Sequence, residues 1–111
     1  MPGARAWRET VRNVIYTPSA IKDIDAAVTY LFFNLAAPQA ARDLVRELDE
    51  TVKRVMGQPY SGSLYRTDNR MRDEIRWVPV KGFVLYYAVT EDAVQIRRFL
   101  HGRQDRENRD F

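Results

Sequence analysis

The histidine at position 101 is the side chain in this sequence best suited to proton transfer near neutral pH. It is the only histidine among 111 residues, and imidazole ionises closer to neutrality than other unperturbed side chains. As a general acid or base in RNA cleavage, it would need a ribose hydroxyl within hydrogen-bond reach and arginines on the phosphate. The arginines that could supply this charge are Arg72, Arg76, Arg98 and Arg103. The alternative is a structural role, in which His101 closes a strand before a turn at Gly102.

Charged and aromatic side chains on the predicted strands form a second group of candidates. Arg72 and Arg76 share one face of an alternating segment, with Glu74 between them. This face could grip phosphates or carboxylates, or Glu74 could neutralise the arginines in a salt ladder. Tyr86 and Tyr87 are consecutive and therefore point to opposite faces of a strand. We expect one of these tyrosines to be exposed, where it could stack on a base or seat a side chain of a protein partner.

The composition excludes several classes of site. Cysteine is absent, which excludes disulfides, thiolate nucleophiles and cysteine-based metal centres, and a single histidine leaves no paired-histidine motif. We therefore do not expect a metal enzyme. Arginine supplies 15 of the 18 basic residues, and the net charge is +3. An arginine-rich surface suits an acidic partner or nucleic acid, although arginine-rich codon usage would give the same bias.

A chain of 111 residues fits one domain. Its longest apolar stretch, 28–37, is interrupted by Thr29 and Asn34 and is shorter than the ~20 residues that a bilayer requires. The first residues lack the apolar run of a secretory signal. We expect a cytoplasmic protein that does not associate with membranes. The domain is placed at 11–105, with a loosely ordered N-terminal arm at 1–10 and a polar tail at 106–111.

Hydrophobic spacing predicts two amphipathic helices. The first helix has apolar residues at intervals of 3, 4, 3 and 4, namely Ile21, Ile24, Val28, Leu31 and Leu35. A second helix begins at Pro38 and is stopped by Gly57 and Pro59. The link between the two helices is short, which favours an antiparallel helical hairpin. Because Phe32 and Phe33 are consecutive, they cannot both face the core, and we expect one of them to be exposed until a partner covers it.

The remaining segments predict a sheet. Strands are expected at 11–16, 71–79, 83–90 and 93–100, and the segment 57–70 is interpreted as a loop. Short turns join the last three strands, which makes them an antiparallel meander. The predicted fold is therefore α+β: a strand, an antiparallel helical hairpin, then a three-strand antiparallel meander. The helices should pack on one sheet face and leave the other partly open.

The chain resembles the toxins of the bacterial RelE/ParE superfamily over residues 11–105. The residues that carry the resemblance are IYTPSA at 15–20, which opens the first helix, VLYY at 84–87, and IRRFLHGRQD at 96–105. They occur in the order and spacing that the superfamily shows. The ending LHGRQD is more similar to the ParE-like branch than to the ribonuclease branch.

This resemblance implies a toxin that a cognate protein antitoxin neutralises in a hetero-oligomer, without a cofactor. The ParE-like branch implies a non-enzymatic inhibitor of DNA gyrase. The alternative is a ribosome-dependent mRNA endonuclease, with His101, Arg72, Arg76 and Arg103 as catalytic residues. A simple nucleic-acid-binding module is a third reading, which the acidic residues among the arginines do not favour. For the antitoxin we predict contacts on the open sheet face, with Arg72, Arg76, Tyr86, Tyr87 and Arg98 as binding residues.

Overall fold

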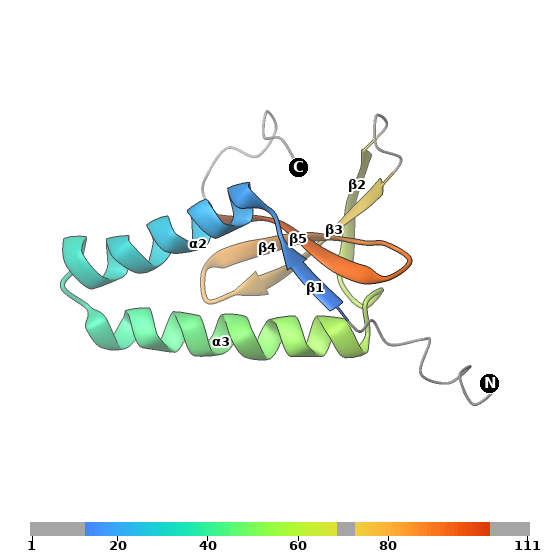
Figure 1. Ribbon diagram of the computed structural model, residues 1–111. Coiled ribbons are helices and arrows are strands. Elements are labelled where there is room, and N and C mark those ends of the chain that lie inside the picture. The colour runs from blue at the N-terminus through green and yellow to red at the C-terminus, as the bar shows by residue number, and fades with distance from the viewer. Residues whose placement is uncertain (1–12, 69–72, 103–111) are drawn as a thin grey trace.

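The computed structural model describes residues 13–68 and 73–102, which form a five-stranded sheet with two helices packed against it (Figure 1). The strand order is β1-β5-β4-β3-β2. Strand β1 pairs in parallel with β5, and the other neighbouring strands pair antiparallel. The strands are β1 (Asn13–Tyr16), β2 (Ser63–Asp68), β3 (Asp73–Val80), β4 (Phe83–Val89) and β5 (Ala93–His101). This arrangement confirms the predicted α+β class.

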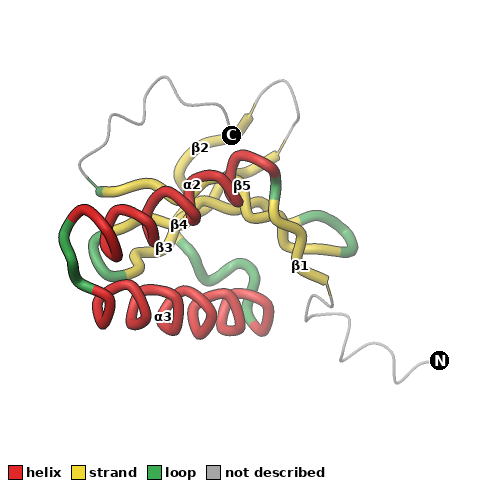
Figure 2. The backbone as a smooth tube through the Cα atoms, turned by 60° about the vertical axis from the view of Figure 1, so that its left-hand side comes forward, coloured by secondary structure: helices red, strands yellow, loops and turns green. Residues whose placement is uncertain are grey.

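The helices form the predicted antiparallel hairpin, which Figure 2 shows beside the sheet. They are α2 (Pro18–Thr29), its π-helical continuation η1 (Tyr30–Asn34), and α3 (Pro38–Gly57). The Thr17 hydroxyl accepts a hydrogen bond from the Ala20 amide at 3.1 Å and donates one to the Arg97 carbonyl at 3.0 Å. One side chain therefore caps α2 and fastens its first turn to β5. Within the described ranges, neither helix has the length and apolar character needed to cross a membrane.

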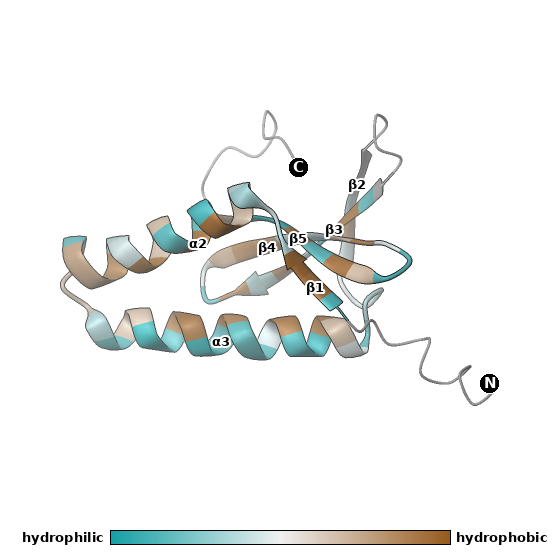
Figure 3. Cartoon of the chain, viewed as in Figure 1, coloured by the Kyte–Doolittle hydropathy of each residue, from teal (hydrophilic) through white to brown (hydrophobic). Residues whose placement is uncertain are grey.

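The main core lies between α3 and the sheet face that it covers. The apolar stripe of α3 is visible along the helix in Figure 3, and its spacing of three to four residues places it on one side. From α3, the buried members of this core are Leu44, Leu48, Val52 and Val55. From the sheet, they include Leu85, Tyr87, Val94, Ile96 and Phe99.

The opposite sheet face, which we expected to be partly open, carries a smaller core. Its buried members are Ile75, Val84, Tyr86, Ala88 and Leu100. Tyr65 on β2 packs edge-on against Tyr86, with ring centroids 5.3 Å apart. The strand that supplies Tyr65 lies in the segment that we interpreted as a loop. The interpretation was wrong because a register shift between Leu64 and Arg66 interrupts the alternation that identifies a strand.

The buried face of α2 also differs from the predicted one. Ile21 and Leu35 are 57% and 53% exposed, whereas Ala20 and Ala27 are buried. Small side chains allow a helix to approach a sheet closely, so the two alanines are buried, while Ile24 and Leu31 of the predicted face pack against the core and are partly buried. The π-helical turn then changes the helical phase beyond Thr29.

A bulge in β5 explains an irregularity in the sequence pattern. Tyr86 is paired with Arg98 and Tyr87 with Ile96, so Arg97 has no partner in this register. The extra residue shifts the alternation, and both Ile96 and Phe99 consequently join the main core. Strict alternation from Ile96 would put Arg98 on the same face as Ile96, and the bulge removes this conflict.

Candidate functional site

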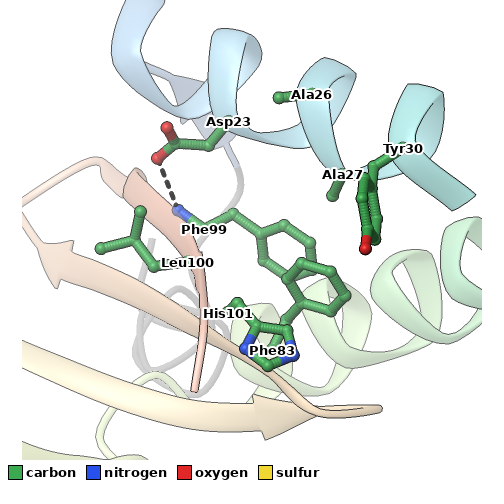
Figure 4. A pocket seen from close by; sticks show the side chains of 8 residues that line it. All are labelled: Asp23, Ala26, Ala27, Tyr30, Phe83, Phe99, Leu100 and His101. Carbon is green, nitrogen blue, oxygen red and sulfur yellow. Dashed lines mark hydrogen bonds between the residues drawn. The ribbon is translucent and has the colours of Figure 1, made fainter. Parts of the chain in front are cut away.

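An accessible groove lies between α2 and the ends of β4 and β5 (Figure 4). Its volume is about 550 Å³. The lining residues are Asp23, Ala26, Ala27, Tyr30, Phe83, Phe99, Leu100 and His101. Most of these side chains are apolar, and this lining suits apolar side chains of a partner better than a phosphate or a metal ion.

Aromatic rings form the floor of the groove. Phe83 and Phe99 are stacked, with centroids 5.0 Å apart and ring planes 9° from parallel. The His101 ring meets Phe83 edge-on at 5.3 Å. The strand register produces this cluster, because Phe83 on β4 is paired with His101 on β5. The floor is therefore held by the pairing of two adjacent strands.

Helix α2 supplies the wall. Ala26 and Ala27 have small side chains that leave the groove open, and Tyr30 stands one turn further along, 51% exposed. These positions share a helical face because they are three and four residues apart. The groove can therefore accept a bulky apolar group between Tyr30 and the stacked rings.

An ion pair fixes α2 against β5 beside this groove. Asp23 accepts hydrogen bonds from the Arg98 guanidinium at 2.6 Å and 2.9 Å, and from the Phe99 amide at 3.0 Å. The two charged side chains are only 12% and 15% exposed. The pair therefore positions the helical wall of the groove relative to its floor. Arg98, predicted to contact an antitoxin, is engaged with Asp23 within the chain.

The two central tyrosines are both buried, so the expectation that one is exposed is wrong. Tyr86 is 1% exposed and Tyr87 0% exposed. The Tyr87 hydroxyl donates to the Pro59 carbonyl at 2.7 Å and accepts from the Gly62 amide at 3.0 Å. Burial raises the pKa of Tyr87 above its ordinary value of 10.0. Tyr87 thus anchors the loop before β2 from inside the core.

Arg76 holds the same loop from the surface. Its guanidinium donates to the Gly62 carbonyl at 3.0 Å, pairs with Glu74 at 3.1 Å, and lies 5.2 Å from the centre of the Tyr60 ring. Glu74 therefore pairs with Arg76, as one of the two interpretations of this strand face proposed. Arg72, the other arginine of that face, lies outside the described residues.

The structure does not bring His101 and Arg76 together. Their register partners on β4, Phe83 and Tyr87, are four residues apart. That corresponds to about 13 Å along the strands, and the two residues also lie on opposite sides of β4, roughly 10 Å apart across the sheet. Arg103 lies outside the described residues. His101 is exposed at the rim of the groove, and Arg76 is committed to the loop.

The groove is the feature that sequence reasoning missed. Phe83 and Phe99 were assigned to strands and Tyr30 to a helix, without a prediction that they meet. The sequence contains a partial indication that Phe83 and Phe99 lie close together. Phe83 directly follows the turn at Gly82, and Phe99 lies near the end of the strand that pairs with it. The third side chain, Tyr30, could be placed only by the packing of α2.

Comparisons with known proteins agree with this architecture. A solved structure described as the chromosomal ParDE TA system from P. aeruginosa has the same fold, with a TM-score of 0.64 and 21% sequence identity, covering 85% of this chain and 97% of that chain. No curated protein matches the chain significantly. The family described as ParE toxin of type II toxin-antitoxin system, parDE, matches residues 14–106. This match spans most of the sequence, and the chain belongs to the ParE toxin family.

Proposed function

We propose that this protein is the toxin of a type II toxin–antitoxin pair, that a cognate antitoxin neutralises it, and that it arrests growth by inhibiting DNA gyrase. The family match over residues 14–106 carries the proposal. The apolar groove gives it further support, because such a surface suits binding to a protein. The separation of His101 from Arg76 favours an inhibitor over an enzyme that needs both groups on one phosphate.

A ribosome-dependent mRNA endonuclease remains the second candidate. The observation that favours it is the exposure of His101, which leaves the imidazole accessible to a substrate. The other proposed catalytic groups are Arg72, Arg76 and Arg103, and of these only Arg76 lies among the described residues.

We place the antitoxin over the groove rather than on the sheet face first predicted for it. Tyr86 and Tyr87 are buried beneath the chain itself, and Arg98 is paired with Asp23. The stacked Phe83 and Phe99, in contrast, line an accessible hollow. An apolar segment of the antitoxin would be anchored there. Arg76, whose side chain is 18% exposed, stays a proposed contact for an acidic group.

Expression of this chain without an antitoxin should abolish colony formation, because its target-binding surface is then uncovered. The purified protein should block DNA supercoiling by gyrase and leave ribosome-bound mRNA intact. Colony counts after induction and the two biochemical reactions, run in parallel on one preparation, measure these effects. The tests require no assumption about the position of the binding surface.

Two outcomes would contradict this assignment. Normal growth at high expression of folded protein would oppose the toxin function in the host tested. Codon-positioned mRNA cuts that disappear in His101→Ala, with supercoiling unaffected, would replace the gyrase inhibitor by the nuclease. His101→Ala should otherwise leave gyrase inhibition within about threefold of the wild type, since it removes one side chain at the rim.

Replacement of Ala26 by glutamate should weaken antitoxin binding at least tenfold. The new carboxylate would stand in the apolar groove, where an antitoxin side chain must displace its hydration, and tenfold corresponds to about 1.4 kcal/mol. Calorimetric titration with the antitoxin measures this loss. Ala40→Glu is the matched control, because Ala40 is also an exposed helical alanine but lies outside the groove. Equal affinities of the antitoxin for Ala26→Glu and the wild type would show that it does not bind in the groove.

A further inference from the structure

We propose that the tip of the helical hairpin pairs two copies of this chain about a two-fold axis. The hairpin tip is defined here by its four exposed apolar side chains, Tyr30, Phe32, Phe33 and Leu35. The proposal does not depend on toxin activity, since it concerns the association of the purified chain with itself.

The hairpin tip exposes more apolar side chains than the sequence analysis predicted. Tyr30, Phe32, Phe33 and Leu35 are 51%, 42%, 72% and 53% exposed. We had expected one phenylalanine to be exposed, but both are, with their ring centroids 5.0 Å apart. From the usual area of these side chains, the tip presents roughly 400 Å² of apolar surface. Exposed apolar surface of this size, concentrated at one end of a small protein, is often functional.

The charge pattern selects a second copy as the occupant. Residues 26–41 contain no charged side chain, although 30% of the whole chain is charged. Binding of a nucleic acid would require cationic side chains on this surface. Such side chains would also favour the binding of an acidic protein. Near a two-fold axis, in contrast, any charge meets the same charge on the other copy. A surface without charge avoids this repulsion and is therefore compatible with self-association.

The backbone at the tip is shaped so that both phenylalanines point outward. The Leu35 amide donates to the Tyr30 carbonyl at 3.0 Å, which is the wider turn of a π-helix. Ala36 then has a φ of 49°, a left-handed conformation that costs a non-glycine residue about 1 kcal/mol. Wider turns and strained residues are concentrated at functional sites. At this tip they accompany two exposed aromatic rings, Phe32 and Phe33.

The size of the tip sets the expected strength of the dimer. Two tips would bury roughly 800 Å² in total, below the roughly 1,600 Å² of a standard stable interface. The neighbouring groove, which shares Tyr30 with the tip, can add surface. We therefore expect a weak dimer with a dissociation constant on the order of 10 to 100 μM.

Sedimentation velocity of antitoxin-free protein from about 1 to 500 μM tests this proposal. The wild type should shift from monomer to dimer over this range, with no larger species, and Phe33→Ser should weaken the dimer at least tenfold. Leu64→Ser is the matched control, because Leu64 is 54% exposed on β2, away from the tip. A monomeric wild type at the highest concentration, open-ended association, or equal effects of the two variants would overturn the proposal.

A charge-pairing experiment tests the two-fold arrangement. Asn34 is exposed within the tip, and both Asn34→Glu and Asn34→Lys should weaken self-association through like-charge repulsion. An equimolar mixture of these two variants should form a heterodimer at least as tight as the wild-type dimer. A mixture that associates no better than either variant alone would show that the tip does not face its own copy. Circular dichroism confirms that each variant is folded before the comparison.

Discussion

Replacement of Arg98 by alanine should lower the free energy of unfolding by about 3–5 kcal/mol. The substitution leaves the Asp23 carboxylate, 12% exposed, without the two guanidinium hydrogen bonds at 2.6 Å and 2.9 Å. The Phe99 amide would still donate a hydrogen bond to this carboxylate, at 3.0 Å. A carboxylate that loses its cationic partner in a largely dehydrated position strongly destabilises the folded protein. The intact pair contributes less to stability than its disruption costs. Urea denaturation followed by circular dichroism measures the change.

Arg46→Ala is the matched control for this experiment. Arg46 pairs with Asp43 at 2.9 Å, but the two side chains are 62% and 35% exposed. Water screens such a pair, so its loss should change stability by less than about 0.5 kcal/mol. If both arginine variants cost the same small amount, Asp23 is hydrated in solution and does not fix α2 against β5. The wall of the groove would then lack the positional restraint assigned to this pair.

Replacement of Gly62 by alanine should cost about 3 kcal/mol of stability. A Cβ atom at this position would lie 2.5 Å from the Tyr87 hydroxyl and 3.1 Å from the Trp77 carbonyl. Tyr87 is fully buried and cannot move without breaking its hydrogen bonds to Pro59 and Gly62. Either the loop or the tyrosine must shift, which combines overpacking with the loss of buried hydrogen bonds. The same denaturation measurement applies.

Gly57→Ala is the matched control, for which we expect no loss of stability. Gly57 is the last residue of α3, and a Cβ atom there would have no atom within 4 Å. Alanine should leave stability unchanged or raise it by up to about 1 kcal/mol, because it restricts the unfolded chain. A Gly62→Ala variant as stable as Gly57→Ala would mean that the loop before β2 is not held against Tyr87.

The stability variants also bear on the proposed function. Arg98 lies beside the groove and Gly62 lies on the loop that Arg76 and Tyr87 hold. Loss of antitoxin binding in Arg98→Ala, measured under conditions where the variant is folded, would indicate that the position of α2 matters for recognition. The corresponding test of Gly62→Ala should affect the groove less, since the loop does not line it.

Local features of the sequence were sufficient to identify the helices, most of the strands and the fold class. Pro38 and Gly57 bound α3 as predicted, because backbone geometry at a helix end favours these residues locally. Short turns required β3, β4 and β5 to be antiparallel. Strand β2 escaped prediction because its bulge interrupts the local pattern. Hydrophobic spacing placed Ile24 and Leu31 against the core correctly, but it also placed Ile21 there, where the smaller Ala20 is buried instead.

The groove and the state of the candidate residues depend on contacts between distant parts of the chain. Asp23 and Arg98 are separated by 75 positions, and Tyr87 and Pro59 by 28. The bulge in β5 sets which of its side chains face the helices, and the packing of the first helix decides that Tyr30 lines the same groove as Phe83 and Phe99. Hydrophobic periodicity indicates the face of a helix or strand on which a residue lies. It does not indicate how neighbouring helices and strands are aligned with one another. For that reason Tyr86, Tyr87 and Arg98 were recognisable as notable residues, while their burial and pairing followed from how the strands and helices pack.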